Sequence, residues 1–227
     1  MFAGIVQVTG RVVRRLRRGD RTLLSVGCAE WRGRPRPGDS VAVDGVCLTV
    51  TRVSGDRFEM DLGAETLART TLGECRPGQV VNLETPLRAA DPIGGHLVQG
   101  HVDGTGRVAA LRPEPGGRRV VVEIPEAFHA YVVERGCVAV NGVSLTVTAV
   151  RNGGIEMFLI PYTLRETNLG GLRRGDRVNL EFDPLGKYVS RWLGETGRTP
   201  PARGPAGRGA SGAGGGRRAA VRGSRNP

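Results

Sequence analysis

Two segments of this 227-residue chain present a reactive type of side chain in the same setting. Cys47 lies in GVCLTV and Ser144 lies in GVSLTV, so a thiol and a hydroxyl occupy equivalent places. Either group becomes a nucleophile when a neighbouring base or positive charge activates it. The residues next to Cys47 supply no such group. The alternative is that both are small strand residues that fill a barrel.

Two histidines lie in the segment PIGGHLVQGHVDG, at positions 96 and 101. No third ligand follows at metal-site spacing and the H-E-x-x-H pattern is absent, so we predict no metal site. The glycines beside them let the backbone approach a flat ligand closely. We therefore expect His101 to lie in a pocket wall, where an imidazole can donate, accept or transfer a proton.

These segments belong to an internal duplication. Residues 40–51, SVAVDGVCLTVT, match residues 137–148, CVAVNGVSLTVT, in nine of twelve positions at an offset of 97. ETLARTTL at 65–72 and GQVVNLE at 78–84 find their counterparts at the same offset. A period this long is a whole domain rather than a solenoid repeat. We predict two copies of one fold, at residues 1–97 and 98–186.

Each copy has the pattern of a β-domain. Asp44-Gly45 and Asn141-Gly142 are flanked by Val-rich runs, which predicts a two-residue hairpin with positive φ at both turn positions. Further runs predict strands: GIVQV, TLLSVG, RFEMDL and VVNLE in the first copy, and GRVAAL, RRVVVEIP, IEMFLI and RVNLEF in the second. About six strands in about 90 residues fit a small closed antiparallel barrel.

A helix is expected after the second copy, over residues 187–195 and starting near 184. Asp183 can cap its start, and Pro184 suits the first helical position. An apolar stripe follows at helical spacing, formed by Leu185, Tyr188, Val189, Trp192 and Leu193. The stripe packs either on its own barrel or on another subunit, and the pattern does not choose between them.

The net charge of +11 is mostly a property of the C-terminal tail, residues 196–227, which hold seven arginines and no acidic residue. The tail is rich in Gly, Ala, Pro and Arg, so we predict that it is disordered. It has no aromatic residue for base stacking, which disfavours nucleic-acid binding.

The four cysteines form no C-x-x-C pair, which predicts reduced thiols without zinc. No long apolar run or signal peptide is visible, so we expect no membrane span and a cytoplasmic location.

Together these motifs resemble the α-chain type of riboflavin synthase. The resemblance rests on the start MFAGIV, the hairpins GVCLTV and GVSLTV, the linker GGHLVQGHVDG, the paired ETL and T-N-L segments, the VNLE strands and the closing D-x-L-x-KYV. It covers residues 1 to about 193 in order, and the tail lies outside it.

The resemblance implies an all-β fold, a tandem duplication of a six-stranded Greek-key β-barrel followed by a C-terminal α-helix that holds a homotrimer. It implies the last step of riboflavin biosynthesis. In that step two molecules of 6,7-dimethyl-8-ribityllumazine exchange a four-carbon unit to give riboflavin and 5-amino-6-(D-ribitylamino)uracil, without a cofactor. The two reacting molecules would face each other across neighbouring subunits. Lumazine synthase is a candidate partner.

The resemblance also places one ligand in each barrel. To the first site it assigns Gly4, Ile5, Val6, Cys47, Leu48, Thr49, Asp61, Leu62, Gly63, Ala64, Glu65 and Thr66. To the second site it assigns Gly100, His101, Val102, Ser144, Leu145, Thr146, Phe158, Leu159, Ile160, Pro161, Tyr162 and Thr163. Phe2, Ser40 and Asp183 match positions near the ligands. The candidate catalytic residues are His101, Cys47, Ser144, Thr146 and Asp183, with the base and the nucleophile left open.

Two positions depart from the family pattern. Arg135 stands where the family usually has Lys, and its guanidinium can meet a polar ligand but does not readily lose a proton. Ala3 replaces the usual Thr and removes a hydroxyl near the first site.

The main alternative function is a carrier of the same fold that binds lumazine or flavin without turning it over. Retention of the full motif in both copies favours the enzyme.

Overall fold

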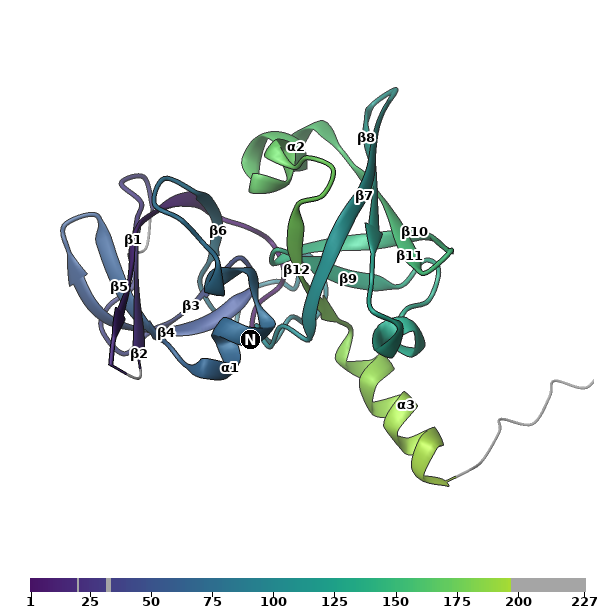
Figure 1. Cartoon of the computed structure of the whole chain (residues 1–227), viewed down its shortest axis with the longest axis horizontal. Coiled ribbons are helices and arrows are strands. Elements are labelled where there is room, and N and C mark those ends of the chain that lie inside the picture. The colour runs from purple at the N-terminus through teal and green to yellow at the C-terminus, as the bar shows by residue number, and fades with distance from the viewer. Residues whose placement is uncertain (20, 32–33, 197–227) are drawn as a thin grey trace, which may run out of the picture.

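The computed structural model describes residues 1–19, 21–31 and 34–196 of the chain. Two barrels lie side by side, and a helix projects from the second barrel (Figure 1). Apart from Thr196, the tail for which we predict disorder lies outside the described residues.

The first barrel closes six antiparallel strands in the order β1-β2-β5-β4-β3-β6. The strands are β1 (Val8–Arg18), β2 (Arg21–Gly27), β3 (Ser40–Val43), β4 (Val46–Ser54), β5 (Arg57–Leu62) and β6 (Val80–Glu84). The helix α1 (Ala64–Arg69) and the 3-10 turn η1 (Thr71–Gly73) connect β5 to β6. Alternate side chains of β5 point into the barrel, where Phe58, Met60 and Leu62 are buried.

The second barrel repeats this arrangement, with the order β10-β11-β8-β7-β12-β9. Its strands are β7 (Gly104–Glu114), β8 (Gly117–Glu123), β9 (Cys137–Val140), β10 (Val143–Arg151), β11 (Gly154–Leu159) and β12 (Arg177–Phe182). Its short helical elements are η2 (Glu126–Tyr131), α2 (Pro161–Glu166) and η3 (Asn168–Gly171). Each strand has the same neighbours as its counterpart in the first barrel. The predicted all-β tandem barrel is therefore confirmed.

Both predicted hairpin turns are confirmed, and they join the two barrels. The turn residues all have positive φ, at 47° for Asp44, 79° for Gly45, 46° for Asn141 and 78° for Gly142. A Cβ atom on Gly45 would lie 2.7 Å from the backbone nitrogen of Gly142, which leaves no room for a side chain. Glycine therefore serves both the turn geometry and the close approach of the barrels.

A buried polar network surrounds these turns. Asp44 Oδ1 accepts a hydrogen bond from the backbone N–H of Asn82 at 2.7 Å, and Asn141 Oδ1 accepts one from Asn179 at 2.8 Å. Across the interface, Asn82 Nδ2 donates to the carbonyl of Asn141 and Asn179 Nδ2 to that of Asp44, both at 2.9 Å. Burial raises the pKa of Asp44 to about 7, against the lowering effect of its hydrogen bonds from Asn82 and Asn168.

One strand prediction is wrong. GIVQV was expected as a strand from Gly4, but β1 begins at Val8. Phe2 and Ala3 instead pair with the linker, since the N–H of Phe2 donates to the carbonyl of Val98 at 2.6 Å and the carbonyl of Ala3 accepts from the N–H of His96 at 3.2 Å. Gly4 has a φ of 72°, which takes the chain out of extended geometry. The chain therefore rejoins the first barrel just before β1, where the N–H of Gln7 donates to the carbonyl of Leu83 at 3.0 Å.

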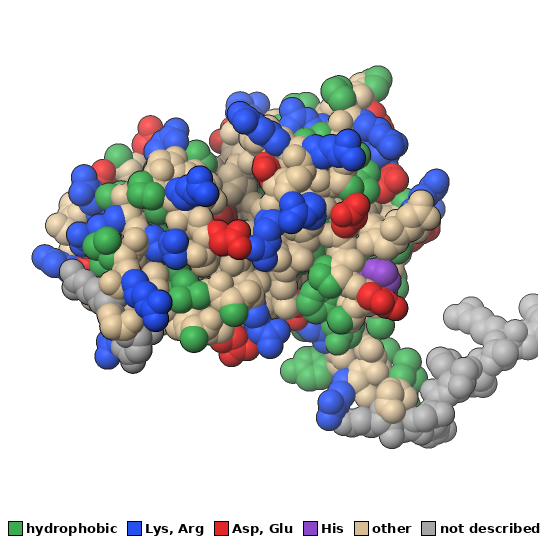
Figure 2. All heavy atoms as spheres, in the orientation of Figure 1, with side chains coloured by type: hydrophobic (Ala, Val, Ile, Leu, Met, Phe, Trp, Pro, Cys, Tyr) green, Lys and Arg blue, Asp and Glu red, His purple; other side chains and the backbone are tan. Residues whose placement is uncertain are grey.

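The C-terminal helix α3 spans Pro184–Thr196. Asp183 caps it, because its Oδ1 accepts from the N–H of Leu185 at 2.9 Å. Four residues of the apolar stripe are 55–72% exposed, namely Leu185, Tyr188, Val189 and Trp192. Apolar side chains stand out on α3 in Figure 2. Among the described residues, no helix is long and apolar enough to cross a membrane.

Candidate functional site

Two crossing segments link the barrels at the predicted site residues. The N-terminal segment carries Gly4 to the second barrel, where its carbonyl accepts from the N–H of Ser144 at 2.8 Å. The linker carries Gly100 to the first barrel, where its carbonyl accepts from the N–H of Cys47, also at 2.8 Å. Each glycine therefore lies against the candidate reactive residue of the other copy.

This exchange corrects the grouping that the sequence suggested. Residues 4–6 were expected beside Cys47 and residues 100–102 beside Ser144, and both assignments are wrong. Val6 packs against the core of the second barrel, and Val102 packs against the core of the first. The physical reason is that the N–H groups of Cys47 and Ser144 bond outside their own barrels, to the segment of the other repeat.

We call the region around Cys47 the first-barrel site. Leu48, on β4, and Leu62, at the end of β5, are buried in the same cluster as Val102. Ser40 is paired with Thr49 in the register of β3 and β4, so it lies at the edge of this site. The turn that leads from β5 into α1 completes it, with these exposed or half-buried residues: Asp61, Gly63, Ala64, Glu65 and Thr66.

We call the region around Ser144 the second-barrel site. Leu145, on β10, and Leu159, on β11, pack in one cluster with Val6. The turn from β11 into α2 provides the residues equivalent to 61–66, namely Phe158, Leu159, Ile160, Pro161, Tyr162 and Thr163. Where the first-barrel site has Ser40, this site has Cys137, which is paired with Thr146.

The two glycines leave no space for a side chain. A Cβ atom on Gly4 would lie 2.7 Å from Ser144 Cβ, and one on Gly100 would lie 2.5 Å from Cys47 Cβ. Both have positive φ, at 72° and 81°. These positions therefore require glycine for two independent reasons, backbone conformation and close approach.

The structure adds one residue that was not among the candidate site residues. Nδ1 of His96 lies 2.7 Å from Oγ of Ser144, and its ring is buried. Burial lowers the pKa of His96, although the nearby charge of Asp183 acts in the opposite direction. His96 Nε2 is buried and lacks a hydrogen-bond partner among the described residues. A neutral imidazole with unprotonated Nδ1 can accept the proton of the Ser144 hydroxyl.

The linker thus supplies one histidine to each site. His96 reaches the second-barrel site, whereas His101 follows Gly100 at the first-barrel site and is exposed. The glycine-rich linker predicted a site role for His101 alone, and only the fold shows that His96 is the histidine buried against Ser144.

The other candidate residues differ in exposure. Phe2 is fully buried between the barrels, where it packs against Val98 of the linker in a small apolar cluster. Thr146 and Arg135 are exposed, and Asp183 is half-buried at the start of α3. In a single chain both sites are open. At the second-barrel site Ile5, Ile160 and Tyr162 are 49%, 51% and 63% exposed.

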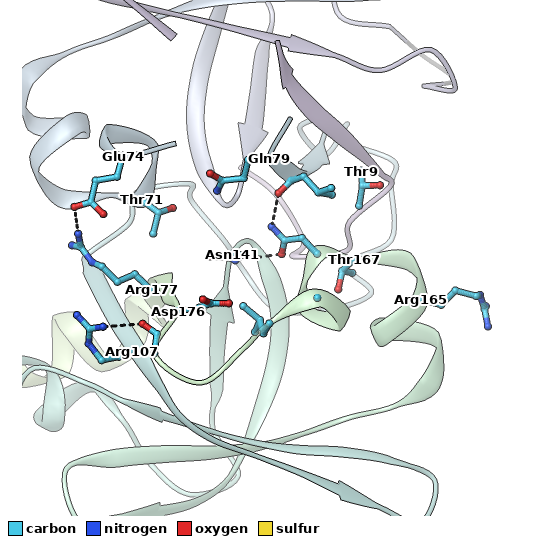
Figure 3. Close-up of a pocket in the computed structure, with 15 residues that line it drawn as sticks. Thr9, Thr71, Glu74, Gln79, Arg107, Asn141, Arg165, Thr167, Asp176 and Arg177 are labelled. Carbon is cyan, nitrogen blue, oxygen red and sulfur yellow. Dashed lines mark hydrogen bonds and ion pairs between the residues drawn. The ribbon is translucent and has the colours of Figure 1, made fainter. Parts of the chain in front are cut away.

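A separate groove lies between the barrels, with a volume of about 780 Å³ (Figure 3). Its described lining contains none of the candidate site residues. Arg177 is paired with Glu74, and Arg107 donates to the carbonyl of Gly175 at 2.8 Å. These cations are engaged within the protein, so the groove is a polar seam between the barrels.

Comparison with known proteins agrees with the duplicated fold. The Lumazine binding domain family matches residues 3–86 and 99–183. A riboflavin synthase of Mycobacterium tuberculosis is 44% identical over 201 residues, which is 87% of this chain and 100% of that protein. Riboflavin synthases of Actinobacillus pleuropneumoniae and Bacillus subtilis are 37% and 34% identical, each covering 85% of this chain and 90% of theirs.

Solved structures of LumP have the same fold. LumP complexed with riboflavin aligns with a TM-score of 0.73 at 27% identity, covering 80% of this chain and 99% of that chain. LumP complexed with 6,7-dimethyl-8-(1'-D-ribityl) lumazine aligns with a TM-score of 0.71 at the same identity and coverage.

Proposed function

This chain belongs to the riboflavin synthase family of proteins with two lumazine-binding domains, and we propose that its duplicated sites carry out the reaction of that family. The chain is a riboflavin synthase. It transfers a four-carbon unit between two molecules of 6,7-dimethyl-8-ribityllumazine and releases riboflavin and 5-amino-6-ribitylaminouracil. The two products contain every atom of the two substrates, so the exchange needs no external oxidant or reductant.

The observation that carries this function is the presence of two equivalent sites in one chain. Cys47 under Gly100 and Ser144 under Gly4 have the same backbone contact at the same distance. A reaction between two identical molecules calls for two similar sites. Holding both rings in place converts a bimolecular step into an effectively unimolecular one, which removes about 7–11 kcal/mol of the barrier in favourable cases.

We assign ring binding to three segments at each site. The first-barrel site uses residues 47–49, 61–66 and 100–102, and the second-barrel site uses residues 4–6, 144–146 and 158–163. Backbone N–H and C=O groups of these segments provide directional contacts, and the buried leucines provide an apolar floor. We propose that Ser40 and Arg135 contact the polar parts of the ligands from the edges.

The chemistry needs a proton to leave the methyl group on C7 of one lumazine. That methyl is acidic because its carbanion delocalises into the ring. His96 and Ser144 are the pair best arranged to take part at the second-barrel site, since they are 2.7 Å apart and the imidazole is held neutral by burial. We propose that His101 and Cys47 act at the first-barrel site, and that Thr146 and Asp183 support the second.

The open sites of a single chain favour an assembly. Ligand sites usually bury about 70–90% of a small molecule, whereas Ile5, Ile160 and Tyr162 at the second-barrel site are 49%, 51% and 63% exposed. We propose a homotrimer in which the first-barrel site of one subunit faces the second-barrel site of its neighbour. The exposed apolar stripe of α3 would hold the subunits together. Lumazine synthase remains a candidate partner on the family resemblance alone.

We also propose a cytoplasmic location. Its support is that all four cysteines are unpaired thiols, as expected in a reducing compartment.

Activity and binding separate this function from that of a carrier. Purified protein is incubated with the lumazine, and riboflavin formation is followed by absorbance. The synthase produces riboflavin and the uracil in equal amounts. Ligand that binds without any riboflavin being formed identifies a carrier and refutes the synthase.

Subunit mixing tests the shared site. Gly4→Val closes the second-barrel site and Gly100→Val closes the first, so each variant alone should be inactive. If the reacting sites face each other across subunits, trimers reassembled from both variants recover activity, roughly a quarter of the wild-type level by random mixing. No recovery in mixed oligomers shows that the sites do not meet between chains.

The role of α3 is tested separately. Leu185→Asp combined with Val189→Asp places two charges in the exposed stripe. Sedimentation should then report monomers, with activity lost and both barrels still folded. A trimer that persists in this variant shows that another surface holds the subunits.

A further inference from the structure

Two buried carboxylates occupy equivalent positions at the ends of β6 and β12. Glu84 and Glu181 are 97 residues apart, and their side chains are only 4% and 2% exposed. A buried carboxylate is costly unless strong donors satisfy it. What these two carboxylates bind is therefore informative about their role.

Both carboxylates bind the backbone of a crossing segment. Glu84 Oε1 accepts from the N–H of Ala3 at 2.8 Å. Glu181 uses both oxygens, since Oε1 accepts from Gln99 at 2.6 Å and Oε2 accepts from Gly100 at 2.9 Å. Each carboxylate therefore reaches out of its own barrel to hold one of the two segments that run between barrels.

The held segment covers the site of the other barrel. Glu181 belongs to the second barrel, but the carbonyl of Gly100 accepts from Cys47 of the first. Glu84 belongs to the first barrel, but the residue after Ala3 is Gly4, whose carbonyl accepts from Ser144 of the second. The contacts are thus crossed, and each barrel fixes the wall of its neighbour's site.

Building on the proposed function, we propose that Glu84 and Glu181 are positioning residues, each of which sets the ligand affinity of the site in the opposite barrel. Glu181 acts on the first-barrel site through Gly100, and Glu84 acts on the second-barrel site through Ala3 and Gly4. The duplicated fold thereby links its two sites within one chain.

The geometry predicts which substitution has the larger effect. In Glu181→Gln one carboxylate oxygen becomes an amide NH₂, which then faces a backbone N–H and cannot accept from it. The variant loses one charge-assisted hydrogen bond and leaves a buried donor unpaired. In Glu84→Gln the remaining oxygen can still accept from Ala3, so the effect is smaller and falls on the second-barrel site.

Thiol protection measures each site separately. The parent protein for this experiment carries Ser144→Cys, so that positions 47 and 144 both hold a thiol. Iodoacetamide labels the full chain at increasing riboflavin concentrations, and peptide mass spectrometry reports the labelling of each position. Glu123→Gln, at an exposed glutamate at the end of β8, serves as the matched control.

We expect Glu181→Gln to raise the riboflavin concentration for half-protection of Cys47 at least tenfold, and to change protection at position 144 less than twofold. Glu84→Gln should do the reverse with a smaller shift, about threefold at position 144. A merely structural role predicts loss at the variant's own barrel, or an equal loss at both positions. Either of those patterns overturns the proposal.

Three further outcomes separate the proposal from its premises. If Glu181→Gln does not fold, as judged by circular dichroism, Glu181→Asp keeps both oxygens on a shorter side chain and must give the same selective loss at Cys47. If riboflavin protects neither thiol in the parent protein, the assignment of ligand sites around positions 47 and 144 is refuted, and with it the positioning role; the proposed reaction is tested separately, by riboflavin formation in the unaltered chain. Protection at both positions with no selective loss in the variants refutes the positioning role alone.

Discussion

Replacing Gly100 with alanine inserts one methyl group where the linker meets the first-barrel site. The new Cβ atom would lie 2.5 Å from Cys47 Cβ and 3.0 Å from the backbone nitrogen of Cys47. Non-bonded carbon atoms prefer a separation of about 3.5–4.0 Å, so the segment must move by about 1 Å. The φ of Gly100 is also positive, at 81°, which an L-residue adopts at a cost of about 1–2 kcal/mol.

Gly78 provides the matched control, because it has a similar φ of 86° and open space around its Cβ position. Gly78→Ala should lower the free energy of unfolding by about 1 kcal/mol through backbone strain alone. Gly100→Ala adds an overpacking cost of about 1–3 kcal/mol, for a total of about 2–4 kcal/mol. It also displaces the carbonyl that accepts from Cys47 and the N–H that donates to Glu181.

Urea unfolding and riboflavin formation are measured for both variants. Gly78→Ala should retain wild-type turnover, while Gly100→Ala should lose at least tenfold in activity under conditions where both are folded. Equal destabilisation of the two variants, or full activity in Gly100→Ala, would refute the conclusion that this segment forms the wall of the site.

Three further predictions concern the titrating and reactive groups. Burial raises the pKa of Asp44 to about 7 from an ordinary value near 4, so its contribution to stability is present below pH ~4 and is lost as the pH rises through about 7. Asp44→Asn places at this position the residue that the second barrel has at Asn141. The free energy of unfolding in urea should then no longer fall between pH 4 and 7, and at pH 8 it should be roughly 2–4 kcal/mol higher than in the wild type. An unchanged free energy of unfolding at pH 8 contradicts this. His96→Gln should lower kcat about 100-fold and remove the fall in rate at acidic pH. Burial lowers the pKa of this imidazole, and only its neutral form accepts the Ser144 proton. A fall in rate at acidic pH that is the same in the variant argues against a proton-transfer role. Cys47→Ser should keep near-wild-type turnover, since a hydroxyl already occupies the equivalent place in the second barrel, and a loss of 100-fold or more would identify the thiol as an obligatory nucleophile.

The repeated motifs were sufficient to predict the two barrels. Asp44-Gly45 and Asn141-Gly142 indicated hairpins because a two-residue turn with positive φ is a local requirement that few residue pairs meet. Asp183 and Pro184 indicated the start of α3 for a similar local reason. Each of these signals depends on a few neighbouring residues.

The sequence motifs did not show which barrel the N-terminal segment and the linker each contact. Gly4 aligns with Gly100 in the repeat, and both precede strands of their own copy, so the simplest grouping kept each with its own barrel. The role of His96 was missed for a related reason: its partner Ser144 is 48 residues away, and the first repeat has no equivalent histidine.

The sequence by itself determined two β-barrels, their shared motifs and the family, because hairpin turns, alternating apolar residues and a 97-residue repeat are written along the chain. Only the tertiary structure decided which glycine covers which reactive side chain and which histidine is buried. Those pairings depend on the backbone N–H groups of Cys47 and Ser144, which do not bond within their own barrels. Gly100 and Gly4, in the segments of the other copy, supply the carbonyl groups that accept from them.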